Sequence, residues 1–288
     1  IPALLEQSRD IVAYAQTGTG KTAAFGLPVV QQVDCSTPLT QALVLCPTRE
    51  LCMQITRDLS GFAKYLPSLQ ILPVYGGASI GEQIRKLERG AQVVVATPGR
   101  AVDLIRRKKL DLSHVRWLVL DEADEMLSMG FKDDLDFILA ATPPARQTLL
   151  FSATMPPEMV AIANKYMTHP LEISVGKKNT GAENVAHEYF MVHAKDRYEA
   201  LKRIADLHPR IYGIVFCRTR AETREVADNL IRDGYNADAL HGDLSQEQRD
   251  IVMNRFRNRH LQLLVATDVA ARGLDVNDLS HVINYNLP

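Results

Sequence analysis

The chain has 288 residues, of which 46% are hydrophobic and 23% charged, with a net charge of -1. This composition is that of an ordinary soluble globular protein, and the length predicts about two domains. No apolar run approaches the ~20 residues of a membrane span, and the first ten residues do not form a signal peptide. We therefore expect a cytoplasmic protein without a membrane partner, a nuclear or nucleolar location being the alternative.

Short apolar runs alternate with amphipathic stretches along the whole chain. Because the runs are continuous, they predict strands buried on both faces, as in a parallel sheet covered by helices. The first series comprises 11–14, 42–46, 93–96, 117–120 and 148–151, and the second comprises 213–217, 237–240, 263–267 and 281–285. The predicted fold class is α/β, with two tandem, doubly wound, parallel-sheet domains.

A polar stretch over 174–188 separates the two series. We predict an N-terminal domain over 1–175, a linker over 176–185 and a C-terminal domain over 186–288. Polar motifs directly follow eight of the apolar runs. Because ligands of doubly wound folds bind at the carboxyl ends of strands, these motifs predict one functional face in each domain.

The cysteines Cys35, Cys46, Cys52 and Cys217 form no C-x-x-C pair. Cys46 and Cys217 each end an apolar run. We therefore expect buried free thiols in a reducing compartment rather than zinc ligands or disulfides.

The first polar motif is "AQTGTGKT", residues 15–22, a phosphate-binding loop with alanine in place of the first glycine. Its glycines allow a tight turn whose backbone N–H groups converge on an anion, at the positive end of the following helix. Lys21 is expected to reach the β and γ phosphates and Thr22 to bind Mg²⁺. A glycine-rich turn with a chance GKT is the alternative, which the flanking strand and helix patterns disfavour. The predicted nucleotide-contacting residues here are Gln16, Thr17, Gly18, Thr19, Gly20, Lys21 and Thr22.

A second motif supplies the acids that a phosphate loop needs. In "WLVLDEAD", residues 117–124, an apolar run delivers Asp121 and Glu122 to its end. Asp121 is expected to hold Mg²⁺ and Glu122 to orient and deprotonate the attacking water. Alone, these acids could mark a helix N-terminus. Together with the phosphate loop they favour catalysis, and Lys21, Asp121 and Glu122 are the predicted catalytic residues.

The order and spacing of eight motifs resemble the DEAD-box family of ATP-dependent RNA helicases. The motifs are "AQTGTGKT", "PTRELCMQ", the glycines 76–77, "TPGR", "DEAD", "SAT", "HGDLSQEQR" and "VATDVAARGLD". The resemblance spans essentially the whole chain. It implies two RecA-like domains that bind ATP, Mg²⁺ and single-stranded RNA, hydrolyse ATP and locally separate short RNA duplexes. It also implies RNA binding without sequence specificity, accessory protein partners and a monomer.

The resemblance assigns roles to further residues. Guanidinium, hydroxyl and glycine groups suit a sugar-phosphate backbone. For "TPGR" the alternative is a plain turn, and for Arg249 it is a helix-surface base paired with Asp250 or Glu247. The implied RNA contacts are Pro47, Arg49, Gly77, Thr97, Arg100, Arg218, Thr219, Gly242, Gln246, Arg249 and Thr267; the implied further ATP contacts are Gly273 and Asp275; the implied coupling residues are Ser152, Thr154, Asp268 and Arg272.

The basic run "RRKK", residues 106–109, is the densest in the chain. It fits a phosphate-binding surface or the cation-rich last turn of a helix, which the helix dipole favours. Competing functions are a DNA helicase of the same superfamily and a non-catalytic RNA clamp.

Two departures from the family pattern stand at the ends of the sequence. The adenine-clamping segment that precedes the phosphate loop in the family is not in the sequence, nor is the arginine-rich motif that follows its last strand. Here that strand reads "HVINYNLP", with Asn286 in place of the usual acid. In the family, the arginines of that motif reach the γ phosphate of ATP, and such an arginine finger raises the rate of hydrolysis by about 10³–10⁵-fold. We therefore expect a shortened core in which residues 1–288 alone show little RNA-stimulated ATP hydrolysis, restored by extension through the motif.

Overall fold

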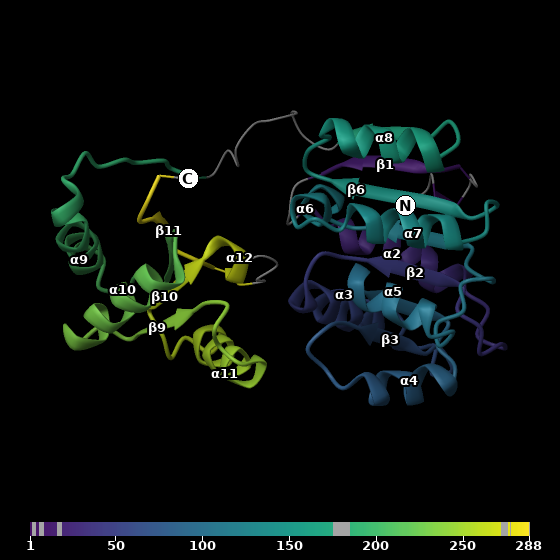
Figure 1. Cartoon of the computed structure of the whole chain (residues 1–288), viewed down its shortest axis with the longest axis horizontal. Helices are drawn as coiled ribbons and strands as arrows, with labels where there is room; N and C mark the ends of the chain where they lie inside the picture. The colour runs from purple at the N-terminus through teal and green to yellow at the C-terminus, as the bar shows by residue number, and fades with distance from the viewer. Residues whose placement is uncertain are drawn as a thin grey trace. The chain divides into compact units, whose positions relative to one another are not determined.

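The computed structural model describes residues 1, 4–5, 9–15, 19–174, 185–271, 276 and 278–287. The chain forms two compact units, Ile1–Glu183 and Asn184–Pro288, here called the N-terminal and C-terminal units (Figure 1). Their division falls outside the described residues, so the predicted linker over 176–185 stays a prediction. Within the described ranges, no helix is both long and apolar enough to span a bilayer.

The N-terminal unit is a parallel sheet between two layers of helices. Its seven described strands lie in the order β3-β4-β2-β5-β6-β1-β7. The strands are β1 (Ile11–Tyr14), β2 (Ala42–Leu45), β3 (Ile71–Val74), β4 (Val93–Ala96), β5 (Trp117–Leu120), β6 (Gln147–Ser152) and β7 (Leu171–Ser174). The helices are α2 (Lys21–Gln32), α3 (Arg49–Phe62), α4 (Ile80–Glu88), α5 (Pro98–Arg106), α6 (Ala123–Ser128), α7 (Lys132–Ala141) and α8 (Pro157–Tyr166).

Each strand of this sheet contributes side chains to two cores. In β2, Leu43 and Leu45 join the core under α4 to α8, while Val44 joins the core under α2 and α3. The central strands β2, β4 and β5 are buried at every position. This two-sided burial is why their sequences read as continuous apolar runs, and the predicted parallel sheet is confirmed.

The strands β3 and β7 were not predicted, and both lie at the edges of the sheet. Their burial alternates along the chain, so neither carries the continuous apolar run of a central strand. Pro73 lies within β3. A proline is tolerated in an edge strand because its missing N–H has no partner strand to bond.

The C-terminal unit repeats the same architecture on a smaller scale. Its four described strands, all paired in parallel, lie in the order β11-β8-β10-β9. They are β8 (Gly213–Cys217), β9 (Ala237–Leu240), β10 (Leu263–Thr267) and β11 (His281–Asn284). The helices α9 (Arg197–Leu207) and α10 (Arg220–Arg232) pack on one core, and α11 (Gln246–Arg257) and α12 (Asp268–Ala271) on the other. The short 3-10 helix η1 (Ala194–Asp196) precedes α9.

The strand predicted from "HVINY" is less buried than the other described strands of its unit. It forms β11, which pairs with β8 and has no second partner among the described residues. Ile283 packs against the core, whereas Val282 is 60% exposed. β11 is therefore a half-buried edge strand, not the fully buried core strand that its composition predicts.

The thiol prediction is confirmed for three cysteines. Cys46, Cys52 and Cys217 are buried and free, while Cys35 is half-buried and free. Burial is the main reason that the pKa of the Cys46 thiol is raised well above its usual value and that of Cys217 to about 12. These groups remain thiols at neutral pH and act as small apolar side chains.

Close packing of α2 on α3 depends on Gly26. A Cβ atom at this position would lie 2.5 Å from Leu59 Cδ2 and 3.2 Å from Phe62 Cδ2. We expect Gly26→Ala to lower the free energy of unfolding by about 1–3 kcal/mol through overpacking. Gly61→Ala, in α3 with no atom near the added methyl, is the control and should raise stability by about 0.5–1 kcal/mol. Urea unfolding measures both, and equal effects would contradict the expectation.

Candidate functional site

The predicted polar motifs lie at the carboxyl ends of the strands. In the N-terminal unit, Thr48, Thr97 and Asp121 come directly after or close to the ends of β2, β4 and β5, and Ser152 ends β6. In the C-terminal unit, Thr219, His241 and Asp268 follow β8, β9 and β10 in the same way. Since parallel strands end at one edge of their sheet, each unit collects its motifs on one edge, as predicted.

The end of the phosphate loop forms the N-terminus of α2. Gly20 has φ of 80°, a left-handed conformation that glycine adopts without strain, and Lys21 is the first helical residue. No described side chain caps this helix, and its first turn contains no acid. Its N–H groups and positive dipole end are thus available for an anion. The predicted contacts Gln16, Thr17 and Gly18 lie outside the described residues, as do Arg272, Gly273 and Asp275.

Lys21 and Asp121 lie close together although they come after different strands, β1 and β5, which have β6 between them. Lys21 Nζ lies 3.7 Å from Asp121 Oδ1, and both side chains are almost fully buried. The Glu122 backbone N–H donates to Asp121 Oδ1 at 3.0 Å. Thr22 follows Lys21 in the first turn of α2. The three predicted catalytic residues are therefore neighbours at one strand edge.

Burial changes the acidity of both carboxyl groups. The pKa of Asp121 is raised by desolvation, which outweighs the opposing charge of Lys21. The pKa of Glu122 is raised by desolvation first and by the Asp121 charge second. A raised pKa suits a group that must take up a proton from water near neutral pH.

Glu122 also has an unusual backbone conformation. It is the N-cap of α6, with φ of 51° and ψ of 50°, in the left-handed region. This conformation costs a non-glycine residue roughly 1–2 kcal/mol. Such strain is retained where the surrounding structure requires one side-chain position.

The "SAT" segment contacts an acid of the "DEAD" motif through one of its two hydroxyls. Thr154 Oγ1 donates to Asp124 Oδ2 at 2.7 Å, and the Thr154 N–H donates to the same oxygen at 2.9 Å. Ser152 Oγ instead donates to the carbonyl of Thr154 and so shapes the turn. The end of β6 is thus bound to the start of α6.

Two predicted RNA-binding arginines join neighbouring loops of the N-terminal unit. The Arg49 guanidinium stacks over the Tyr75 ring, 5.0 Å from its centre. Arg100 donates to the Ala78 carbonyl at 3.2 Å and to Gln83 Oε1 at 2.9 Å. These contacts hold the loop that carries Gly77, which has φ of 80°, against "PTRE" and "TPGR". Pro47 and Thr97 lie at the same edge, where Thr97 is the N-cap of α5.

Three predicted residues of the C-terminal unit meet at the end of β10. Arg249 Nη2 donates to the Ala270 carbonyl at 3.0 Å, and the Ala270 N–H donates to Thr267 Oγ1 at 3.3 Å. Arg249 thus anchors α12 to α11, and Asp268, the first residue of α12, is exposed.

The other predicted residues of this unit lie on adjacent turns. Thr219 caps α10 by accepting the Glu222 N–H at 3.2 Å. Arg218 is exposed; its N–H donates to Asn286 Oδ1 at 2.9 Å and its Nη2 to the Leu287 carbonyl at 3.1 Å. Gly242 follows β9, and Gln246 begins α11. Asn286 therefore joins the end of β11 to the start of α10.

A charged network beside Gly242 was not predicted residue by residue. Arg220 and Arg224, one turn apart on α10, both contact the Asp243 carboxylate. Buried His241 accepts the Asp243 N–H through Nδ1 at 3.3 Å, and burial followed by the Arg224 charge lowers its pKa. The "HGD" motif and the i, i+4 spacing of the arginines were the available signals.

A cavity of about 390 Å³ lies elsewhere in the N-terminal unit. It is lined by residues that precede strands, including Gln41, Arg116 and Arg146. Because residues that precede parallel strands lie at the amino ends of those strands, the cavity is at the edge of the sheet opposite the motifs. None of the predicted site residues lines it.

Both units are doubly wound parallel sheets. In the first, a glycine turn leads into a helix whose first residue is a lysine, and acids from a strand end lie beside that lysine. This combination defines the class of phosphate-loop nucleotide-binding proteins. Residues 1–162 match the DEAD/DEAH box helicase family, and residues 196–288 match the helicase conserved C-terminal domain. The chain belongs to the DEAD/DEAH box helicase family, and its two units are RecA-like domains.

The relatives extend this match. The chain is 49% identical to the ATP-dependent RNA helicase DeaD of Mycobacterium tuberculosis and 48% identical to the RNA helicase CrhR of Synechocystis, over 100% of its length in both. It covers 51% and 58% of those proteins, so it spans about half their length. It is also similar to S. cerevisiae Dbp5 bound to RNA and ADP BeF3, with 30% identity, a TM-score of 0.87 and coverage of 100% of this chain and 73% of that one.

Proposed function

We propose that the protein containing this chain is an ATP-dependent RNA helicase that hydrolyses ATP when it binds RNA. The observation that carries the proposal is the buried Lys21–Asp121 pair beside Glu122, at the N-terminus of α2. This arrangement supplies a cation and N–H groups for phosphates, a carboxylate for a metal and a base for water. The RNA helicases among its relatives support RNA as the second ligand.

The residues present fit ATP with Mg²⁺. Asp121 offers carboxylate oxygen and Thr22 a hydroxyl, which are the oxygen ligands that Mg²⁺ prefers alongside phosphate and water. Burial raises the pKa of Asp121, and a bound divalent cation would lower that pKa again by stabilising the carboxylate. Lys21 would bind the terminal phosphates, and Glu122 would orient the attacking water. When bound, Mg²⁺ would neutralise charge that develops on the phosphate oxygens.

RNA would bind along the strand ends of both units through its sugar-phosphate backbone. Arg49 and Arg100 would act mainly by holding the loop around Gly77 open to RNA, because their guanidiniums already contact protein groups. In the C-terminal unit, exposed Arg218 offers direct charge, and Thr219 and Gly242 offer turn groups. A cytoplasmic monomer that binds RNA without sequence specificity, with accessory protein partners, completes the proposal.

The decisive experiment compares ATP hydrolysis with RNA, with DNA of the same sequence and without nucleic acid. It should use the full-length protein, because the chain spans about half the length of the curated relatives that it matches. Stimulation by RNA alone supports the proposal. Equal stimulation by DNA would favour the DNA helicase. ATP-dependent RNA binding without hydrolysis would favour the non-catalytic clamp.

We predict that Thr154→Val weakens the link between RNA binding and hydrolysis. The variant loses the 2.7 Å hydroxyl bond to Asp124 but keeps the backbone bond. A hydrogen bond to a charged group contributes about 1.5–3 kcal/mol, so RNA stimulation should fall roughly tenfold to hundredfold. ATPase rates with and without RNA measure this, and Thr154→Ser, which keeps the hydroxyl, is the control. Unchanged stimulation in the valine variant would contradict the coupling role.

A further inference from the structure

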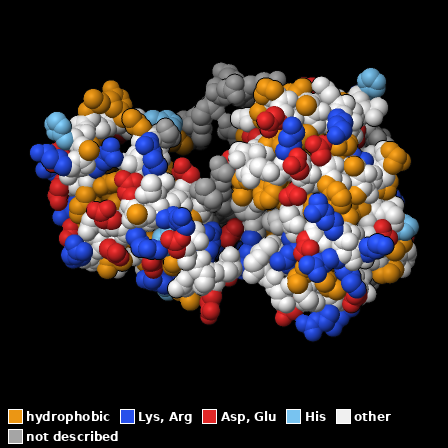
Figure 2. Space-filling model, in the orientation of Figure 1, with side chains coloured by type: hydrophobic (Ala, Val, Ile, Leu, Met, Phe, Trp, Pro, Cys, Tyr) orange, Lys and Arg blue, Asp and Glu red, His pale blue; other side chains and the backbone are white. Residues whose placement is uncertain are grey.

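Seven exposed basic side chains surround the C-terminal ends of α4 and α5. An ion pair between Lys109 Nζ and Glu88 Oε1, at 2.7 Å, joins these two helix ends into one surface. Figure 2 shows Lys and Arg side chains gathered along the lower edge of the N-terminal unit, where Figure 1 places α4. We call this surface the basic patch; it consists of Arg85, Lys86, Arg89, Arg106, Arg107, Lys108 and Lys109.

Most of this charge is not neutralised. Lys109 pairs with Glu88, and Arg107 pairs with Asp103 at 2.7 Å. The Arg106 guanidinium lies over the Phe137 ring, 5.2 Å from its centre, and keeps its charge. In the described part of the chain, no carboxylate comes within ion-pair distance of the remaining four cations, Arg85, Lys86, Arg89 and Lys108. The patch therefore carries a surplus of positive charge although the whole chain is close to neutral.

The helix dipole accounts for part of this pattern only. The dipole favours cations in the last turn of a helix, and this effect fades beyond that turn. Arg85, Lys86 and Arg106 lie in last turns, but Arg89 and Lys108 lie beyond them. The dipole therefore leaves the outer cations of the patch unexplained.

Lys108 occupies a position that usually favours glycine. Its φ is 57°, and its N–H and that of Lys109 donate to the carbonyls of Ile105 and Leu104, which closes α5 in a Schellman motif. Glycine would adopt this conformation without strain. A lysine here adds charge to the patch, but its backbone is strained in this left-handed conformation.

The same two helices begin at the predicted RNA-binding edge. α4 starts three residues after Gly77, and α5 starts directly after Thr97. Both helices run back along the sheet, so their C-terminal ends lie at the opposite edge. The nine residues of α4 span about 13 Å. RNA that continues past the strand ends by a few nucleotides can reach this distance.

We propose that the basic patch is a second RNA-binding surface, which holds the phosphates of RNA that extends beyond the strand-end site. The proposal rests on the RNA-binding function proposed above. Dispersed, flexible cations are typical of phosphate contacts without sequence specificity. A protein partner is less suited, because such interfaces need a buried apolar centre. Phe137, 36% exposed, contacts the patch, but a single aromatic ring under the Arg106 guanidinium is too little apolar surface for such a centre.

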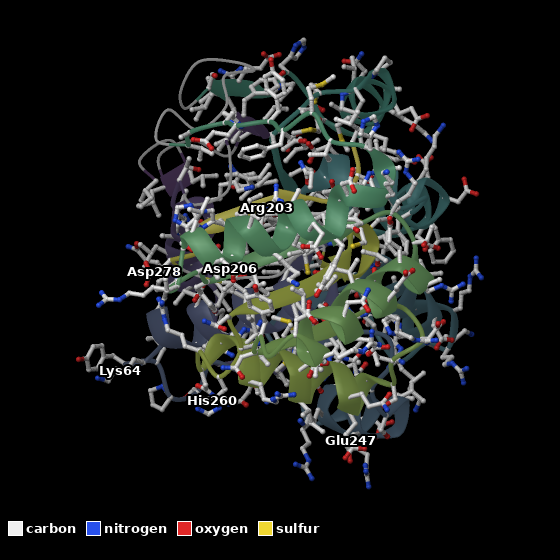
Figure 3. All side chains as sticks on the ribbon, turned by 90° about the vertical axis from the view of Figure 1, so that its left-hand side faces the viewer. Lys64, Arg203, Asp206, Glu247, His260 and Asp278 are labelled. Carbon is white, nitrogen blue, oxygen red and sulfur yellow. The ribbon has the colours of Figure 1, made fainter. Side chains whose placement is uncertain are left out.

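The test is a length series of single-stranded RNA, bound to residues 1–288 with a non-hydrolysable ATP analogue and followed by fluorescence anisotropy at several salt concentrations. The test variant is Lys86→Gln/Arg89→Gln/Lys108→Gln. The control, Arg57→Gln/Lys64→Gln/Arg203→Gln, removes three exposed cations elsewhere, of which Figure 3 labels Lys64 and Arg203. Circular dichroism and thermal unfolding establish that both variants fold as the unmodified chain does.

For long RNA, we expect the test variant to bind more weakly and with a shallower salt dependence. Three lost phosphate contacts, at about 0.7 each, should reduce the slope of log K against log salt by about 2. For the shortest RNA that binds, the test variant, the control and the unmodified chain should agree. Equal slopes for the test and control variants with long RNA would overturn the proposal, and so would competition by polyglutamate as strong as that by RNA.

The length series also separates this proposal from the proposed function. If short RNA binds and lengthening it brings no gain, the basic patch is not an RNA surface and the proposed function stands. If short RNA fails to bind while long RNA binds through the patch, the proposed RNA site at the strand ends is wrong, and the proposal that the basic patch binds RNA is supported.

Discussion

Glu122→Gln is expected to reduce ATP turnover by about 10²–10⁴-fold, the usual contribution of a general base. Glutamine keeps the size of the side chain and its hydrogen-bonding ends but cannot accept a proton from water. Binding of ATP and of RNA should persist, because Lys21, Asp121 and the N-terminus of α2 are unchanged. Single-turnover hydrolysis, measured in the full-length protein, separates the chemical step from binding.

The pH dependence gives this expectation a second readout. Since the pKa of Glu122 is raised, its base form is lost at a higher pH than for an ordinary glutamate. Turnover should therefore fall as the pH decreases through that raised pKa, and this acid limb should disappear in the glutamine variant. Glu125→Gln is the matched control, because Glu125 lies in the same short helix and bonds Ser128 instead. Normal turnover in Glu122→Gln would remove Glu122 from the catalytic role.

Lys21→Met is expected to abolish nucleotide-dependent RNA binding and to reduce turnover by about 10²–10³-fold. Removing one charge-stabilising group from an active site typically costs this much. Lys132→Met is the matched control, because Lys132 is also the first residue of a helix but is exposed. Anisotropy of labelled RNA with and without the ATP analogue measures the binding part on residues 1–288.

The same variant should also change stability in a pH-dependent way. Lys21 lowers the pKa of Asp121, so its removal raises that already raised pKa further. A higher folded-state pKa means that ionising Asp121 costs the folded state more, so Lys21→Met should lose stability at neutral pH. The loss should shrink as the pH falls and Asp121 is protonated. Adding Asp121→Asn should restore stability at neutral pH; a double variant as unstable as the single one would contradict the pairing.

Much of the fold could be predicted because burial leaves a direct record in sequence. β2, β4 and β5 are covered on both faces, so their apolar runs coincide closely with the observed strands. β3 and β7 lack that record because edge strands are covered less evenly. For the same reason β11 proved more exposed than its β-branched residues suggested.

The candidate site was predictable where one motif supplies one role. Lys21, Asp121 and Glu122 lie together because each ends or follows a strand of one parallel sheet. Bonds across long sequence distances were less accessible. Arg249 reaches the Ala270 carbonyl on another helix, and Arg100 bonds Ala78 and Gln83. Such partners depend on how helices pack, which spacing along one helix does not reveal.

The backbone of Glu122 illustrates what activity demands of this fold. Its left-handed conformation and the burial of two neighbouring carboxylates both oppose folding at neutral pH. A glycine at this position would suit the turn better and would lack the carboxylate. A more stable version of this edge would therefore lack the proposed base, and the packed cores of the N-terminal unit must offset the stability that Glu122 and Asp121 cost.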